Sequence, residues 1–170
     1  MSNRLNHQLD LSLNDGAILR VTPITPHVFR VRLRSDGKFR EPGLVRYGIV
    51  KTDWPEVAIE VTQSDSAVVF ETGSTRLNVN RADGSITFSD ASGKVLIENA
   101  APPHSAPEGG FDAAFFLKDG ERLYGLGDET RDCLQKRGHE TPMVLRNVVS
   151  YVPIPFLMST DGWAIFLNST

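Results

Sequence analysis

Cysteine is nearly absent from this chain, and its scarcity limits both cross-links and metal sites. Cys133 is the only cysteine among the 170 residues, so neither an internal disulfide nor a site built from several cysteines can form. None of the four histidines stands at the spacing of a metal-ligand pair, and we favour surface or loop positions for them over a metal site: they are His7, His27, His104 and His139. We therefore expect no metal and no cofactor.

Signals for export, membrane insertion and nucleic-acid binding are also lacking. The first residues, MSNRLNHQLDLSLNDG, contain no apolar core of a signal peptide, and no stretch approaches the ~20 apolar residues of a membrane helix. The net charge of -3 leaves no basic footprint for nucleic acid or an anionic membrane. We expect a cytoplasmic protein with no nucleic-acid or membrane partner.

A helical period is lacking as well, because the apolar residues recur at every second position. Between His27 and Arg34, the residues Phe29, Val31 and Leu33 alternate with three arginines. This alternation predicts a strand with apolar side chains inward and arginines in water, which we favour over an anion-binding stripe. Similar short runs predict further strands near 57–62, 68–70, 77–79, 86–88, 95–97, 115–117, 151–156 and 163–167.

Turn-forming dipeptides separate these runs and suggest hairpins. Asp-Gly pairs begin at residues 15, 36, 83, 119 and 161, and this dipeptide suits the positive φ angles of tight turns. Many short strands at such spacing predict an all-β fold, an antiparallel β-sandwich, in one domain covering residues 1–170. Residues 100–110 (AAPPHSAPEGG) are expected to form a loop, and residues 129–137 at most a turn or two of helix.

Two glycines, Gly125 and Gly127, stand close together in the segment YGLGD. A phosphate-binding loop would need a preceding strand, a following helix and a third glycine, but Thr130 stands at that third position. We favour a backbone turn that needs glycine conformations. Asp128 and Glu129 follow directly and are the best acidic candidates for a site, although aspartate is also a common turn residue.

Amide and aromatic residues near the end of the chain suggest contacts with a sugar. Sugars stack their apolar faces on aromatic rings, while amides and carboxylates bind their hydroxyl groups. Asn147, Tyr151 and Trp163 supply such groups. We expect Trp163 and Phe166 to be core residues, and Asn147 and Tyr151 to lie nearer a loop.

Several short motifs, most of them after residue 120, occur together. They are Tyr124 to Asp128, then Asn147, Tyr151, Ile154 to Phe156, Gly162 and Ile165 to Thr170, with DGSITF and GKVLI at residues 83–97. As a set they resemble the N-terminal domain of glycoside hydrolase family 31, the α-glucosidase and α-xylosidase family. The family pattern is approximately YGLGE, a W-N-x-D loop, Y…IPF and a G-x-x-x-F-x-N-x strand.

The resemblance implies a galactose-mutarotase-like β-sandwich that precedes a catalytic (β/α)8 barrel. In the family, the barrel carries the aspartates of a retaining hydrolysis of terminal α-glycosides, with the nucleophile in a W-x-D-M-type motif. Neither Trp54 nor Trp163 is followed by that motif, and a barrel needs about 250 residues, so we expect no catalytic residue here. The chain stops directly after an apolar run, and we expect Thr170 to be a boundary within a longer protein. Its partners would then be its own C-terminal barrel and a carbohydrate substrate.

The resemblance also implies a loop that reaches the barrel's active site. At the W-N-x-D pattern, Arg146 stands in place of the tryptophan, Asn147 matches, and Val149 replaces the aspartate. Asp128 replaces the glutamate of YGLGE. The substrate-binding residues expected from this comparison are Asn147, Tyr151 and Asp128.

Three other functions fit parts of the same pattern. A free-standing carbohydrate-binding module would need an exposed aromatic platform. An aldose epimerase on this fold would need a histidine acid and a carboxylate base in one cleft, whereas the histidines here are scattered. A structural or oligomerisation domain, in a homo-oligomer for example, would need an exposed apolar patch.

Overall fold

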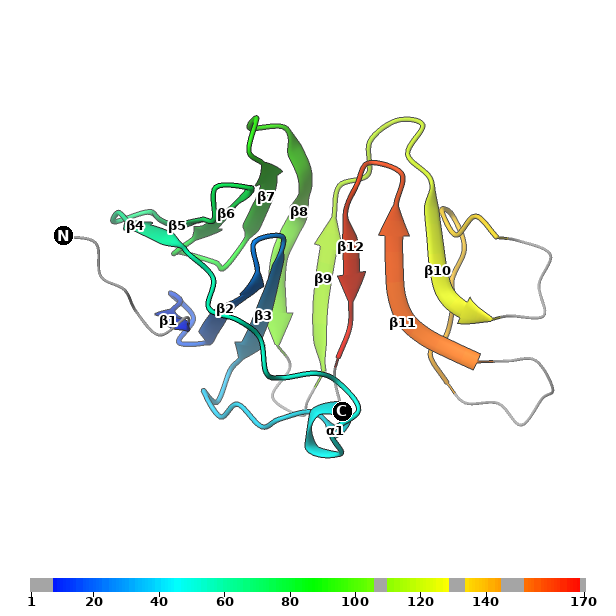
Figure 1. Ribbon diagram of the computed structural model, residues 1–170, viewed down its shortest axis with the longest axis horizontal. Coiled ribbons are helices and arrows are strands. Elements are labelled where there is room, and N and C mark those ends of the chain that lie inside the picture. The colour runs from blue at the N-terminus through cyan, green and yellow to red at the C-terminus, as the bar shows by residue number, and fades with distance from the viewer. Residues whose placement is uncertain (1–7, 106–109, 129–133, 145–151, 169–170) are drawn as a thin grey trace. The chain divides into compact units, whose positions relative to one another are not determined.

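The structure is a computed structural model that describes residues 8–105, 110–128, 134–144 and 152–168 (Figure 1). The chain divides into two compact units, Met1–Glu41 with Gly48–Phe116 and Pro42–Tyr47 with Leu117–Thr170. Apart from the one-turn helix α1 (Gly43–Arg46), the elements in the described residues are strands, and all their pairings are antiparallel. The all-β antiparallel fold is therefore confirmed. No helix in the described ranges is long and apolar enough to cross a membrane.

The first unit contains two sheets whose neighbouring strands are consecutive in the chain. One sheet has the order β1 (Leu9–Ser12), β2 (Ile18–Thr25) and β3 (Val28–Arg34). The other has the order β4 (Glu60–Gln63), β5 (Ala67–Glu71), β6 (Thr75–Asn80), β7 (Ile86–Asp90), β8 (Val95–Ser105) and β9 (Phe111–Phe115). The predicted hairpin turns are confirmed at Asp15-Gly16, between β1 and β2, and at Asp83-Gly84, between β6 and β7. Asp36-Gly37 follows β3 and does not join two paired strands.

A hydrophobic core joins the two sheets of this unit. Alternate residues of β2 are buried against alternate residues of β5 and β6, the period-two pattern of strands covered on one face. The buried cluster comprises Leu11, Leu13, Ala17, Leu19, Val21, Val68, Phe70, Leu77 and Val79. Two sheets that share one core form a sandwich, as the sequence predicted.

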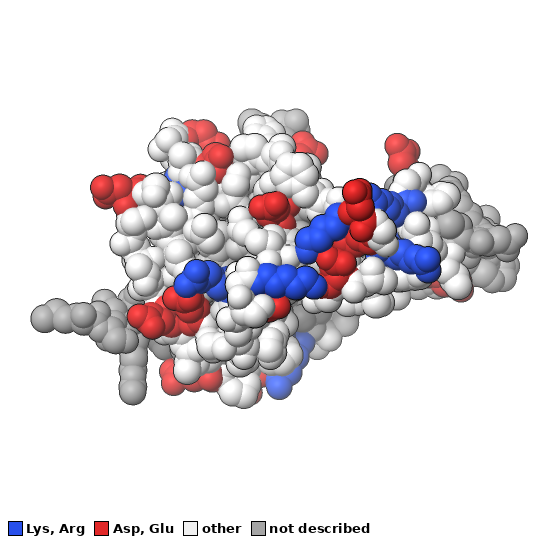
Figure 2. Space-filling model, turned by 90° about the horizontal axis from the view of Figure 1, so that it is seen from above, with Lys and Arg blue, Asp and Glu red and all other residues white. Residues whose placement is uncertain are grey.

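The arginines of β3 face outward, as predicted, but they do not form an open cationic stripe. Arg30 and Arg32 each donate a hydrogen bond of 2.8 Å to Glu41, and Arg34 pairs with Asp36. Figure 2 shows acidic and basic side chains side by side on one face of the molecule. Neighbouring carboxylates thus neutralise these cations, which supports the reading of a solvated strand face.

One apolar residue of β3 departs from the predicted inward position. Phe29 and Leu33 pack against the core, and Phe29 meets Phe70 and Phe88 edge to face. Val31 is exposed instead, because the packing against the second sheet reaches the two larger side chains beside it.

Residues 100–105 were expected in a loop, and this prediction is wrong. They belong to β8, which pairs with β9. The register passes from Ala101↔Ala114 directly to His104↔Asp112, so Pro102 and Pro103 fall into a bulge. Proline has no N–H to donate, and a bulge is where a strand tolerates it. Residues 106–109 lie outside the described residues.

The second unit contains a three-stranded sheet in the order β10 (Leu123–Asp128), β11 (Val152–Ser159) and β12 (Ala164–Phe166). Asp161 and Gly162 lie in the hairpin turn between β11 and β12, with Gly162 at φ +91°. Trp163 is buried, as predicted. Phe166 was also expected in a core but is 43% exposed, because it lies opposite Phe156 on the open face of the sheet.

Candidate functional site

Of the three predicted substrate-binding residues, the structure describes Asp128. It is the last residue of β10, it is exposed, and it lies opposite Val152 of β11. Asn147 and Tyr151 lie outside the described residues, and their contact with a substrate stays a prediction.

The two glycines before Asp128 bring the backbones of β10 and β11 unusually close together. A Cβ atom on Gly125 would overlap the carbonyl oxygen of Phe156, and one on Gly127 would overlap that of Val152. Gly127, Leu126 and Gly125 all have positive φ, of 88°, 66° and 112°. The expected glycine conformations are confirmed, but they occur in a bulged strand and not in a turn between strands.

The bulge changes the register of β10 and β11 without changing the faces of the sheet. Gly125 pairs with Leu157, and the next pair is Gly127 with Pro153. Two steps along β10 therefore match four steps along β11, and both numbers are even. Because paired residues of neighbouring strands point their side chains to the same face, Asp128 shares the face of its partner Val152.

That face of the sheet is apolar and open to solvent. It presents the side chains of Val152, Ile154, Met158 and Phe166, which are between 43% and 55% exposed and are called the apolar face below. The residues that alternate with them along β11 are less exposed. A cluster of large exposed apolar side chains usually marks a surface that another protein segment covers. Asp128 stands at the end of the apolar face, beside Val152.

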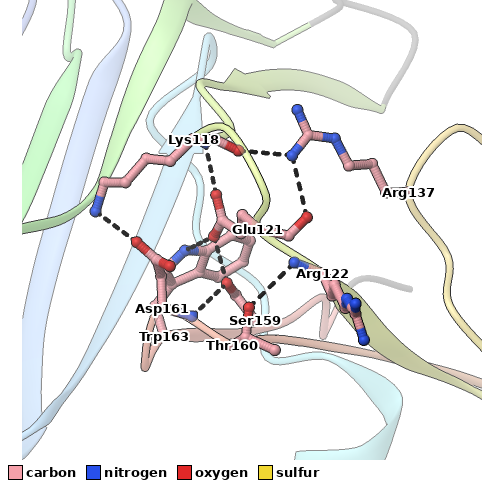
Figure 3. A network of polar contacts seen from close by, with 8 residues as sticks. All are labelled: Lys118, Glu121, Arg122, Arg137, Ser159, Thr160, Asp161 and Trp163. Carbon is pink, nitrogen blue, oxygen red and sulfur yellow. Dashed lines mark hydrogen bonds and ion pairs between the residues drawn. The ribbon is translucent and has the colours of Figure 1, made fainter.

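A buried carboxylate holds the other end of the same sheet together (Figure 3). Glu121 is 3% exposed, and its side-chain oxygens accept three hydrogen bonds. Trp163 Nε1 donates at 2.7 Å and the backbone N–H of Lys118 at 2.8 Å, and the Ser159 hydroxyl is the third donor. All three donors belong to this unit and the carboxylate is buried, so it ties the start of β10 to the hairpin of β11 and β12.

The segment after residue 133 is fastened to the same place. One guanidinium nitrogen of Arg137 donates to the backbone oxygens of Lys118 and Glu121, at 2.6 and 3.0 Å. The backbone N–H of Lys136 donates to the oxygen of Leu123 at 2.7 Å. Sequence reasoning missed this network, because nothing local distinguishes Glu121 among the 21 acidic residues.

A metal site and a charged pocket find little support in the described part of the chain. No group of three or more His, Cys, Asp and Glu side chains there is arranged to hold a metal ion. An open groove in the first unit lies over the ends of β5, β6 and β7. Its charged lining residues Arg76 and Glu71 form an ion pair with each other, at 2.6 Å between nitrogen and oxygen. The strongest candidate site is therefore Asp128 with the apolar face.

Comparisons with solved structures give the same fold. An α-xylosidase of glycoside hydrolase family 31 from Xanthomonas citri matches 95% of this chain with a TM-score of 0.79 at 21% identity. One from a soil metagenome, complexed with xylose, matches 99% with a TM-score of 0.79 at 22% identity. A Flavobacterium johnsoniae dextranase of that family, complexed with glucose, matches 95% with a TM-score of 0.73 at 21% identity. This chain spans 18%, 28% and 21% of those three proteins.

A search of curated proteins found no match to this chain. The family model described as the glycosyl hydrolase 31 N-terminal galactose mutarotase-like domain matches residues 18–170 and thus runs through both compact units. This match bears out the resemblance carried by the YGLGD and IPF segments. The chain belongs to the N-terminal galactose mutarotase-like domain family of glycosyl hydrolase 31.

Proposed function

We propose that this chain is the non-catalytic N-terminal domain of a retaining α-glycosidase that removes terminal α-xylosyl or α-glucosyl residues. Its family membership supports a role within a glycoside hydrolase, and the similar α-xylosidases and dextranase are several times longer than this chain. The reaction itself belongs to the catalytic barrel, since neither tryptophan of this chain lies in a nucleophile motif.

The observation that carries the proposal is the apolar face with Asp128 at its end. Leaving apolar surface in water costs a free energy of roughly 25 cal/mol per Å². The apolar face leaves four side chains about half exposed: Val152, Ile154, Met158 and Phe166. A catalytic barrel of the same protein would cover them. Asp128, together with Asn147 and Tyr151, would then lie at the rim of the substrate pocket.

The proposed subsite makes a prediction for the full-length enzyme. Asn147→Ala, Tyr151→Ala and Asp128→Asn should each raise KM or lower kcat for the substrate, about 3- to 30-fold, because each removes a hydrogen bond or stacking contact. Steady-state kinetics on aryl α-xylosides come first, since two of the similar structures are α-xylosidases, followed by α-glucosides and isomaltose-type oligosaccharides.

Asp112→Asn is the matched control, because Asp112 is also an exposed strand aspartate, in β9 of the first unit. Its kinetics should equal those of the wild type. Unchanged kinetics in all three subsite variants would remove this domain from the substrate pocket. Millimolar or tighter sugar binding by the isolated chain would favour a carbohydrate-binding module instead.

A further inference from the structure

We infer that Gly127 is a positioning residue for Asp128: the Gly125–Leu126–Gly127 bulge sets the place from which this carboxylate meets the substrate. The inference rests on the proposed function, in which Asp128 lies at the pocket rim. It assigns a positioning role to a backbone feature that carries no functional group of its own.

The first argument is the distance between the two strands. At Gly127 an added Cβ atom would overlap the carbonyl oxygen of Val152 and would lie 2.6 Å from the backbone nitrogen of Ile154. These are backbone atoms, which cannot move aside as a flexible side chain does. Any residue other than glycine must therefore push β10 and β11 apart at the position next to Asp128.

The second argument is the pairing of Asp128 itself. Its partner in the register is Val152, the same residue whose carbonyl oxygen approaches Gly127. A displacement at Gly127 is thus passed to Asp128 through one peptide link and one strand partner. Bulges are a known means of re-aiming a side chain near a functional site.

The third argument is the cost of the conformation. Leu126 has φ +66°, a left-handed conformation that is strained for a residue with a side chain. It is the one non-glycine residue with positive φ in the described ranges. Such strain tends to occur where the local backbone geometry serves a function.

Gly162 provides a matched control within the same unit. Its φ of +91° is close to the +88° of Gly127, but an added Cβ atom there meets nothing within 4 Å. Gly162→Ala and Gly127→Ala therefore share the strain of alanine at positive φ. They differ in the overlap with the backbone of β11.

The test is a kinetic double-mutant cycle in the full-length enzyme. Gly127→Ala and Asp128→Ala should each raise KM about tenfold with kcat within about twofold, the size expected for one lost hydrogen bond to a charged group. Gly162→Ala should leave both constants unchanged. In the Asp128→Ala background, Gly127→Ala should raise KM no further, because the bulge acts through that carboxylate.

Several results would overturn the inference. One is a Gly127→Ala enzyme with the kinetics of Gly162→Ala, and another is a double variant whose KM rises by the product of the two single effects. If Gly127→Ala does not fold, Gly125→Ala disturbs the same bulge through an overlap with the carbonyl oxygen of Phe156, and an unchanged KM there would also overturn the inference.

The same experiment separates this inference from the proposed function. If Asp128→Ala leaves KM unchanged while Asn147→Ala or Tyr151→Ala raises it, the proposed function stands and the positioning role falls. If the wild-type enzyme hydrolyses no α-glycoside, the proposed function falls and takes the positioning role with it.

Discussion

Phe70→Ala should lower the free energy of unfolding by about 3–5 kcal/mol, the range measured for large-to-small substitutions in packed cores. Phe70 is 1% exposed and is the largest fully buried side chain among the described residues of the first unit. It lies on β5 within the cluster that joins the two sheets, and its ring meets Phe29 edge to face at 6.4 Å. Alanine would leave a cavity between the two sheets, and the sheets could close this cavity only by moving toward each other.

Urea denaturation followed by circular dichroism measures this loss. The matched control is Phe111→Ala, which removes the same ring from β9, where Phe111 is 45% exposed. The control should change the free energy of unfolding by no more than about 1 kcal/mol. Equal losses in the two variants would mean that the shared core does not hold the sandwich together.

Glu121→Ala should cost about 2–4 kcal/mol in the second unit, because it removes the acceptor of three donors at once, one of them fully buried. Without the carboxylate, the buried Trp163 Nε1 and the half-buried Ser159 hydroxyl lose their acceptor. The backbone N–H of Lys118 also loses its acceptor. An unsatisfied buried donor costs about 1–3 kcal/mol, whereas a made hydrogen bond contributes less.

Glu121→Gln distinguishes lost hydrogen bonds from lost packing. Glutamine keeps the shape and one oxygen acceptor, but its amide group turns a donor toward one of the former donors. Its loss should therefore lie between those of the wild type and the alanine variant. Thermal unfolding and the indole N–H resonance of Trp163 report the change. The control Glu98→Ala removes an exposed carboxylate of β8 and should stay within about 0.5 kcal/mol of the wild type.

The strands predicted best from the sequence are those with a clear alternation and an ordinary turn. β5, β6 and β7 lie where the apolar runs placed them, because covering one face of a strand imposes a period of two. β2 was missed although Leu19 and Val21 are core residues, since Pro23 interrupts its pattern at a register shift. β10 was missed because its two glycines read as a turn.

The candidate site was predicted in part. The sequence analysis identified Asp128, Gly125 and Gly127, because all three belong to the short motif YGLGD, which resembles a motif of a known family. It gave no sign of the apolar face, since Phe166 was expected in a core and is exposed. Exposure depends on which side of a sheet is covered, and that is not a local property of the chain.

The sequence by itself determined that this chain is an antiparallel all-β protein without an internal disulfide and belongs with the family 31 glycoside hydrolases. Alternation, composition and short motifs are local properties, so they can be read one segment at a time. Only the tertiary structure decided that Glu121 holds Trp163, 42 residues away, and that Gly127 lies against Val152. Both depend on which strands pair and in what register, and the register follows from packing across the whole sheet.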